Sequence, residues 1–270
     1  WFDSPPGRYL LAWEQLRFDE AVADLFGYQS LQLGMPCLDT LRANRMPCRW
    51  LALGQEAASA EVLRGPSSVP DWQGAEFMGA LPRLALLAES VALPFADRSL
   101  DLLVLPHALE FSPDPHATLR EVERVLVPEG RVVISGLNPL SLWGLCQWRA
   151  HWAHRWGRGP SYVPHAAEFI GYRRLRDWLR LLNFEVESAR FGCYRPALRS
   201  QDWLERFGWM DRLGAQWWPV FGAAYFVVAI KRVHGMRLME PSWRTAKPRS
   251  AAAMPLAHRS ATRPLGPDRP

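Results

Sequence analysis

The chain has 270 residues, 49% hydrophobic and 22% charged, a composition typical of a soluble globular protein with one large domain or two small ones. Its longest apolar segment, Ala223 to Ile230, is too short to cross a bilayer, and its four scattered cysteines form no CxxC pair, which speaks against a fixed-spacing zinc site and a disulfide framework. Residues 231–270 carry nine Lys or Arg and two acids, whereas residues 1–230 carry 23 basic and 25 acidic residues, so charge indicates no nucleic-acid-binding surface on the body.

The first part of the chain is predicted to contain two helices and two strands. Residues 7–27 have no internal proline and predict a helix that packs on the core. The apolar residues that suit its buried side are Trp13, Leu16, Val22 and Leu25. A strand is predicted over SLQLG (30–34), a short helix over Pro36–Asn44 and a second strand over Arg49–Gly54. Residues 64–75 are rich in Gly, Pro and Ser and are expected to form a loop.

The middle of the chain has the strongest pattern. Residues 83–89 and 100–106 are continuous apolar runs, as expected for strands buried on both faces of a parallel sheet. Apolar residues then recur at helical spacing, with Asp114 as the N-cap of the helix and Pro128 as its stop. Residues 130–138 are a further apolar run, and this order of strand, helix and strand predicts a right-handed βαβ unit.

The second half continues the alternation of helices and strands. Residues 171–184 place apolar side chains on one face and arginines on the other, which predicts a helix, and residues 185–191 and 223–233 predict a final, hairpin-like pair of strands. From residue 234 on, the chain lacks periodicity and is rich in Pro, Ala, Ser and Arg. We therefore expect an N-terminal helix packed on the core (1–27), an α/β domain (28–233) and a basic, disordered tail (234–270).

One segment carries a family resemblance. LPFADRSLDLLVLPHALEFSPDPHATLREVERVLVPEGRVVISGLNPLSLWG (Leu93 to Gly144) resembles the S-adenosylmethionine-dependent methyltransferases of the seven-stranded Rossmann-like class, in their type-11 small-molecule group. The NPLSLWG that begins at Asn138 is similar to a subgroup of uncharacterised bacterial members. The resemblance implies a doubly wound, mostly parallel seven-stranded α/β sheet with helices on both faces and S-adenosylmethionine as the cofactor. In such a sheet, ligands lie beyond the carboxyl ends of the strands.

The first cofactor motif of that family is only partly kept. The family has an apolar strand that ends in an acid and is followed by G-x-G-x-G, whereas this chain has Gln32 at the acidic position and Gly34 as its single glycine. Met35 and Pro36 add bulk, and Pro36 removes an N–H donor. Two interpretations stay open: a narrowed cofactor loop that uses Gly34 and the N-terminus of the following helix, or a glycine that merely ends a strand.

The resemblance places further cofactor ligands after the second and third strands. Gln55 and Glu56 stand where the family has an acid that holds the ribose hydroxyls, about twenty residues after the first loop. Glu89, followed by Ser90, stands where the family has an aspartate that accepts a hydrogen bond from the adenine amino group. A solvated loop acid is the alternative for Glu56, and a solvent-facing side chain is the alternative for Glu89.

His107 follows the fourth strand directly and is the candidate catalytic residue. It is expected either to act as a general base or to line the methionine part of the cofactor. Residues 142–169, which mix tryptophans with arginines and histidines, are expected to form a substrate cap that stacks an aromatic or holds an anionic acceptor. An amphipathic packing helix and an interfacial membrane contact are the alternatives for this segment.

The sequence therefore predicts a cytoplasmic methyltransferase that uses S-adenosylmethionine on a small-molecule acceptor, with no metal, no nucleic-acid partner and no transmembrane segment. The alternative is a degenerate methyltransferase fold that serves as a binding or regulatory module, which the eroded loop at Gly34 favours. Transfer to RNA or protein lacks support, because the body is not basic and no N-P-P-Y-type amine-methylating motif is present. The NPL at Asn138 does not serve as one, since it follows the fifth strand rather than the fourth.

Overall fold

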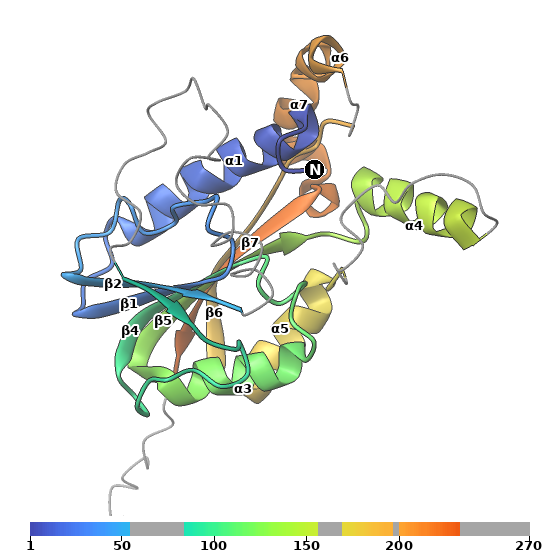
Figure 1. Cartoon of the computed structure of the whole chain (residues 1–270). Coiled ribbons are helices and arrows are strands. Elements are labelled where there is room, and N and C mark those ends of the chain that lie inside the picture. The colour runs from blue at the N-terminus through green and yellow to red at the C-terminus, as the bar shows by residue number, and fades with distance from the viewer. Residues whose placement is uncertain (55–83, 156–168, 197–199, 233–270) are drawn as a thin grey trace, which may run out of the picture. The chain divides into compact units, whose positions relative to one another are not determined.

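A computed structural model describes residues 1–54, 84–155, 169–196 and 200–232 of the chain (Figure 1). The contacts divide the chain into Trp1–Val233 and His234–Pro270, and all of the described residues belong to the first unit. The predicted tail lies outside the described residues.

The described part is built around one seven-stranded sheet in the order β3-β2-β1-β4-β5-β7-β6. Strands β1 to β5 are parallel, and β7 runs antiparallel to both of its neighbours. This confirms the predicted doubly wound, mostly parallel sheet. The elements in chain order are α1 (Pro5–Val22), β1 (Gln29–Leu33), β2 (Cys48–Leu53), β3 (Leu84–Leu87), β4 (Leu100–Pro106), α3 (Pro115–Val125), β5 (Leu126–Leu137), α4 (Leu142–Arg155), α5 (Tyr172–Leu181), β6 (Phe184–Gly192), α6 (Gln201–Arg206), α7 (Trp209–Trp217), η1 (Pro219–Phe221) and β7 (Ala224–Lys231).

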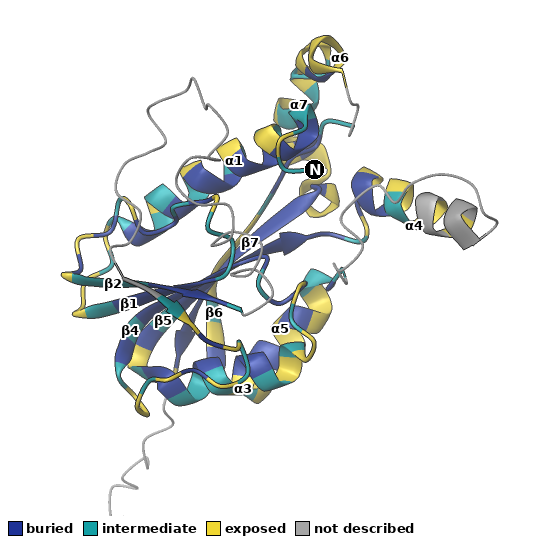
Figure 2. Ribbon diagram, in the orientation of Figure 1, coloured by how far each residue is buried: buried dark blue, intermediate teal, exposed yellow. Residues whose placement is uncertain are grey.

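Helices cover both faces of the sheet, with α1 on one face and α3 and α5 on the other (Figure 1). Alternate residues of a strand point to opposite faces, so Leu103 and Leu105 of β4 pack in the cluster of α3 and α5, whereas Leu102 and Val104 pack in that of α1. The central strands are therefore buried on both sides (Figure 2). This double burial explains why they read as unbroken apolar runs.

Helix α3 begins as predicted and ends earlier. Its N-cap Asp114 accepts a hydrogen bond from the Ala117 N–H at 2.9 Å, which satisfies one of the free donors at the helix start. The helix ends at Val125, three residues before Pro128, because Leu126 already pairs with Leu100 in the sheet. The register then shifts before Leu102 pairs with Arg131, and the intervening bulge accommodates the proline, which has no N–H for the ladder.

Helix α1 covers Pro5–Val22 instead of residues 7–27, and its buried side differs from the predicted one. Leu16 is 51% exposed. The buried stripe includes two polar residues, Glu14 and Gln15, which the apolar pattern could not assign to the core. Both are held by tertiary contacts: Gln15 donates to the Asp39 carbonyl at 2.8 Å, and Glu14 faces His107. The real register of α1 depends on partners that are distant in sequence.

The final pair of strands is antiparallel and adjacent, as predicted, but it is not a tight hairpin. The connection between β6 and β7 contains α6, α7 and η1. These helices lie beyond one end of the sheet, the end at which β5 runs into α4 (Figure 1).

Candidate functional site

The carboxyl ends of the parallel strands form the edge where the resemblance places the cofactor. At the end of β1, Gly34 adopts a φ of 76°, in the left-handed region that glycine tolerates. A Cβ at this position would meet only the Ala108 Cβ, at 3.9 Å, so the space beside the glycine is open. The Gly34 N–H is already donated to the Ala52 carbonyl at 2.8 Å. Gly34 therefore offers a ligand close approach to the backbone rather than this hydrogen-bond donor.

Gln32 is buried under the loop that follows Gly34. Its Nε2 lies 3.2, 3.0 and 2.7 Å from the carbonyl oxygens of Gly34, Met35 and Leu38. Its Oε1 accepts from the N–H and the hydroxyl of Thr40, at 3.1 and 2.8 Å. The amide is thus engaged at both ends in holding the loop, so the geometry supports a structural role for this predicted cofactor residue.

The predicted short helix over Pro36–Asn44 is wrong, because these residues form successive turns. The side chain of Gln32 takes carbonyl and N–H groups that a helix would have used within its own backbone. Consequently, no helix N-terminus follows Gly34 in this described stretch of chain, and the predicted loop-and-helix cofactor motif is reduced to the glycine and its turns.

The ends of β2 and β3 are where the resemblance places the residues that hold the adenosine part of the cofactor. A Cβ at Gly54 would meet nothing within 4 Å. Gln55 and Glu56 lie outside the described residues. Glu89 is exposed and lines a hollow of about 310 Å³ together with residues of the same turn. Ser90 turns toward α3, where its Oγ lies 3.2 Å from the Ser112 hydroxyl and 3.1 Å from the Thr118 hydroxyl.

His107, at the end of β4, lies between two buried carboxylates. Its Nδ1 is 2.8 Å from Glu110 Oε2, and its Nε2 is 2.8 Å from Glu14 Oε1. All three side chains are at most 1% exposed. The second oxygen of Glu110 accepts a hydrogen bond from the Leu137 N–H at the end of β5. This cluster, Glu14–His107–Glu110, ties α1, the end of β4 and the end of β5 together.

The cluster holds a proton on His107. Burial disfavours the charged ring, but Glu14 and then Glu110 outweigh it and raise the pKa of His107 well above its ordinary value of 6.5. Both ring nitrogens face carboxylates within the protein, so neither is presented to a substrate. The geometry supports a positioning role for His107 and does not support the predicted general base. Sequence reasoning missed Glu14, whose only signal was a carboxylate on the apolar stripe of a helix.

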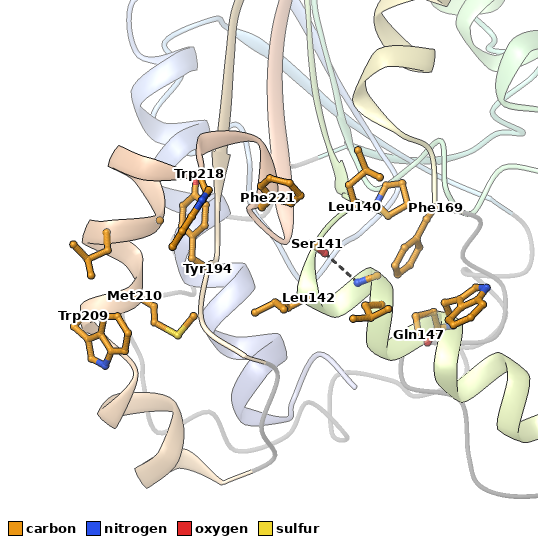
Figure 3. Close-up of a pocket in the computed structure, with 16 residues that line it drawn as sticks. Leu140, Ser141, Leu142, Gln147, Phe169, Tyr194, Trp209, Met210, Trp218 and Phe221 are labelled. Atoms are coloured by element: carbon orange, nitrogen blue, oxygen red, sulfur yellow. Dashed lines mark hydrogen bonds between the residues drawn. The ribbon is translucent and has the colours of Figure 1, made fainter.

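A second hollow, which we call the α4–α7 cavity, opens beyond the end of β5 and measures about 1120 Å³ (Figure 3). One wall comes from Pro139 and Leu140, from α4 and from Phe169, so part of the predicted cap does line a cavity. The opposite wall comes from α7 and the segment around η1, which sequence reasoning missed. Its signal was the aromatic-rich run between residues 207 and 221. Residues 156–168 of the predicted cap lie outside the described residues.

The chain matches known proteins in its middle section and in its fold. A family model described as a methyltransferase domain matches residues 75–134. Uncharacterized protein YafS of Escherichia coli (strain K12) is 35% identical over 167 residues, which are 62% of this chain and 63% of that protein. Malonyl-[acyl-carrier protein] O-methyltransferase 1 of Coxiella burnetii is 40% identical over 73 residues, 26% of each chain. The chain thus matches less than two thirds of the length of these relatives.

Solved structures share the fold. A putative methyltransferase of Haloferax volcanii, solved in complex with the methyltransferase activator Trm112, has a TM-score of 0.54 at 16% identity, over 86% of this chain and 94% of that one. A possible histamine N-methyltransferase of Thermotoga maritima has a TM-score of 0.51 at 14% identity, over 83% and 92%. In the described part of the chain, no helix combines the length and the apolar character needed to span a membrane.

Proposed function

Because residues 75–134 match a family model described as a methyltransferase domain, we propose that this chain is an S-adenosylmethionine-dependent methyltransferase of the type-11 class with a small-molecule acceptor. The observation that carries the proposal is the arrangement at one edge of the sheet. Open space beside Gly34 and Gly54, the hollow at Glu89 and the α4–α7 cavity all lie at the carboxyl ends of the parallel strands, where α/β sheets bind ligands.

The residues at the ends of β1 to β3 fit the adenosine part of the cofactor. The two glycines leave room for close approach, and the exposed Glu89 carboxylate supplies an acceptor for the adenine amino group. Gln55 and Glu56 remain our proposal for the ribose hydroxyls. When bound, the cofactor would supply an electrophilic methyl group on a sulfonium.

The chain itself would act mainly by orientation. Methyl transfer from a sulfonium is an in-line displacement, so catalysis consists largely of aligning donor and acceptor and excluding water. The Glu14–His107–Glu110 cluster would contribute by fixing the ends of β4 and β5, between which donor and acceptor must meet. Such a site suits an acceptor atom that needs no proton removed.

Titration calorimetry with S-adenosylmethionine and S-adenosylhomocysteine tests the proposal. We expect wild-type protein to bind, and Glu89→Ala to bind at least about tenfold more weakly, because it loses a hydrogen bond to a charged acceptor. Glu205→Ala, at an exposed position on α6, is the matched control and should bind like wild type. Absence of heat and of thermal stabilisation with wild type at millimolar ligand would contradict the proposal and favour the degenerate binding module.

We also propose that the protein works in the reducing cytoplasm. Cys37, Cys48, Cys146 and Cys193 form no disulfide. Thiol labelling of intact and lysed cells checks the location, since labelling by a membrane-impermeant reagent before lysis would contradict it.

A further inference from the structure

The α4–α7 cavity is lined by apolar and aromatic side chains, and none of the described residues that line it is charged. Three tryptophans stand at its walls and remain more than half exposed: Trp148 (61%), Trp209 (57%) and Trp218 (62%). Exposed apolar surface of this extent marks a binding site more often than chance, because it is costly to leave in water. Figure 3 shows Trp209 and Trp218 on the α7–η1 side of the cavity, with Leu142 and Gln147 of α4 on the other side.

Two of the polar groups in the lining are already engaged by the protein. The Ser141 hydroxyl donates to the Asn138 carbonyl at 2.7 Å and accepts from the Gly144 N–H at 3.0 Å. The Tyr194 hydroxyl donates to the Pro219 carbonyl at 2.9 Å. What these two residues offer a ligand is therefore mainly carbon surface and an aromatic face.

The charged groups beside the cavity neutralise each other. Arg195, next to Tyr194, pairs with Asp211 at 2.8 Å and lies over the ring of Tyr9. Asp211 also accepts hydrogen bonds from the Tyr9 hydroxyl and the Tyr194 N–H. This arginine is committed to internal partners, so it does not make the cavity a site for an anion. The predicted anionic acceptor rested on the arginines and histidines of residues 142–169, of which 156–168 lie outside the described residues.

The cavity begins where the transferred methyl group would arrive. Pro139 and Leu140 follow the last residue of β5, and Glu110 holds that residue against the end of β4. A volume of about 1120 Å³ equals or exceeds that of typical small-molecule pockets, so it accommodates a ring system or an extended acyl chain.

We propose that the acceptor is a neutral, largely apolar small molecule, held between α4 and the α7–η1 segment with its reactive atom toward the end of β5. This inference rests on the proposed methyltransferase function, but it concerns a different surface from the cofactor residues. It predicts both the polarity of the ligand and the walls that bind it.

Two fluorescent probes with the same ring system separate polarity from size. N-phenyl-1-naphthylamine is neutral, and 1-anilinonaphthalene-8-sulfonate adds one negative charge. We expect saturable, single-site binding of the neutral probe, at least about tenfold tighter than that of the sulfonate, because a buried charge finds no charged partner among the described lining residues.

Substitutions on the two walls locate the probe. Leu142→Asp on α4 and Leu213→Asp on α7 alter side chains that are 47% and 44% exposed, so both variants should fold. Both should lower the affinity for the neutral probe about tenfold or more. Leu181→Asp, at an 80% exposed leucine on α5 outside the cavity, is the matched control and should leave binding unchanged.

Three results would overturn the inference: equal or tighter binding of the sulfonate, wild-type affinity in both wall variants, or capture of the protein by phosphatidylcholine vesicles without saturable probe binding. Calorimetry with S-adenosylmethionine on the same samples separates the two proposals. Cofactor binding without probe binding refutes only the acceptor site, whereas probe binding without cofactor binding refutes the methyltransferase proposal and leaves the cavity as an apolar binding site without an acceptor.

Discussion

Gln32 carries an amide where the family resemblance places an acid, and the structure gives a physical reason for the difference. A carboxylate can only accept hydrogen bonds, whereas the atom at the Nε2 position faces three carbonyl oxygens. Only a side chain that donates at one end and accepts at the other satisfies both the carbonyls and Thr40. Gln32 and the turns that follow Gly34 therefore depend on each other in the loop after β1.

We predict that Gln32→Glu lowers the free energy of unfolding by about 3 kcal/mol at neutral pH, since a buried carboxylate would face carbonyl oxygens. Burial would raise the pKa of the new carboxyl, and its neutral form can donate, so the loss should shrink as the pH falls. Urea unfolding at several pH values measures this. Gln216→Glu, at an exposed position on α7, is the control. A variant as stable as wild type at neutral pH would show that the loop is not held as described.

The Glu14–His107–Glu110 cluster makes a prediction about pH. The folded pKa of His107 is raised above its ordinary value of 6.5, so its ion pairs stabilise the protein fully below that pH and lose their effect as the pH rises through the raised pKa. Glu14→Gln removes the larger of the two charge attractions on the ring and should move the His107 titration to lower pH. NMR of labelled histidine rings follows this directly. Glu20→Gln, on the same helix but outside the cluster, should leave the titration in place.

A His107 titration that is unchanged by Glu14→Gln would mean that Glu110 alone sets the charge of the ring.

The position of His107 after the fourth strand was predictable from the sequence, but its environment was not. Glu14 lies on α1, far away along the chain, and nothing in the local pattern links the two residues.

Among the elements, β4, α3 and β5 were the most predictable, for a reason that packing explains. The two strands are buried on both faces and stand out as continuous apolar runs, whereas the helix is identified by the helical spacing of its apolar residues and by Asp114 at its start. The turns after Gly34 and the register of α1 were not predictable. In both, a buried polar side chain, Gln32 or Gln15, bonds to backbone groups that come close only in the folded chain.

Helix α1 contributes to stability through a few large contacts. Phe18 is fully buried and packs edge-on against Phe226 of β7, with ring centroids 4.9 Å apart. We predict that Phe18→Ala lowers the free energy of unfolding by about 3–5 kcal/mol, as expected for a buried phenylalanine that leaves a cavity. Phe26→Ala, at a ring that is 78% exposed, should change it by less than about 0.5 kcal/mol.

Chemical unfolding of the two phenylalanine variants beside wild type is the measurement. If Phe18→Ala and Phe26→Ala proved equally mild, α1 would be only loosely associated with the sheet. The Glu14–His107–Glu110 cluster would then be open to water, and the raised pKa of His107 would no longer be expected.

At the scale of the whole molecule, the two edges of the sheet differ in character. The carboxyl edge holds the open glycines, the Glu89 hollow and the α4–α7 cavity, whose described lining residues carry no charge. At the opposite edge, Arg232 follows the end of β7 and pairs with Glu129 and Glu185. This edge is closed by ion pairs among the residues that the structure describes, and the described chain ends there.

The difference between these two sides of the sheet leads to a prediction about the basic C-terminal segment. Residues 241–270 carry six Lys or Arg and one acid, lack an apolar period, and follow a strand that ends away from the candidate site. We therefore expect a chain truncated after Glu240 to keep the melting temperature and the cofactor affinity of the full chain, because the described sheet, its core and the α4–α7 cavity are built from residues that precede the segment. Thermal unfolding and calorimetry compare the two forms. A large fall in melting temperature would show that the segment docks on the body, and a loss of cofactor binding at unchanged stability would show that it reaches the carboxyl edge.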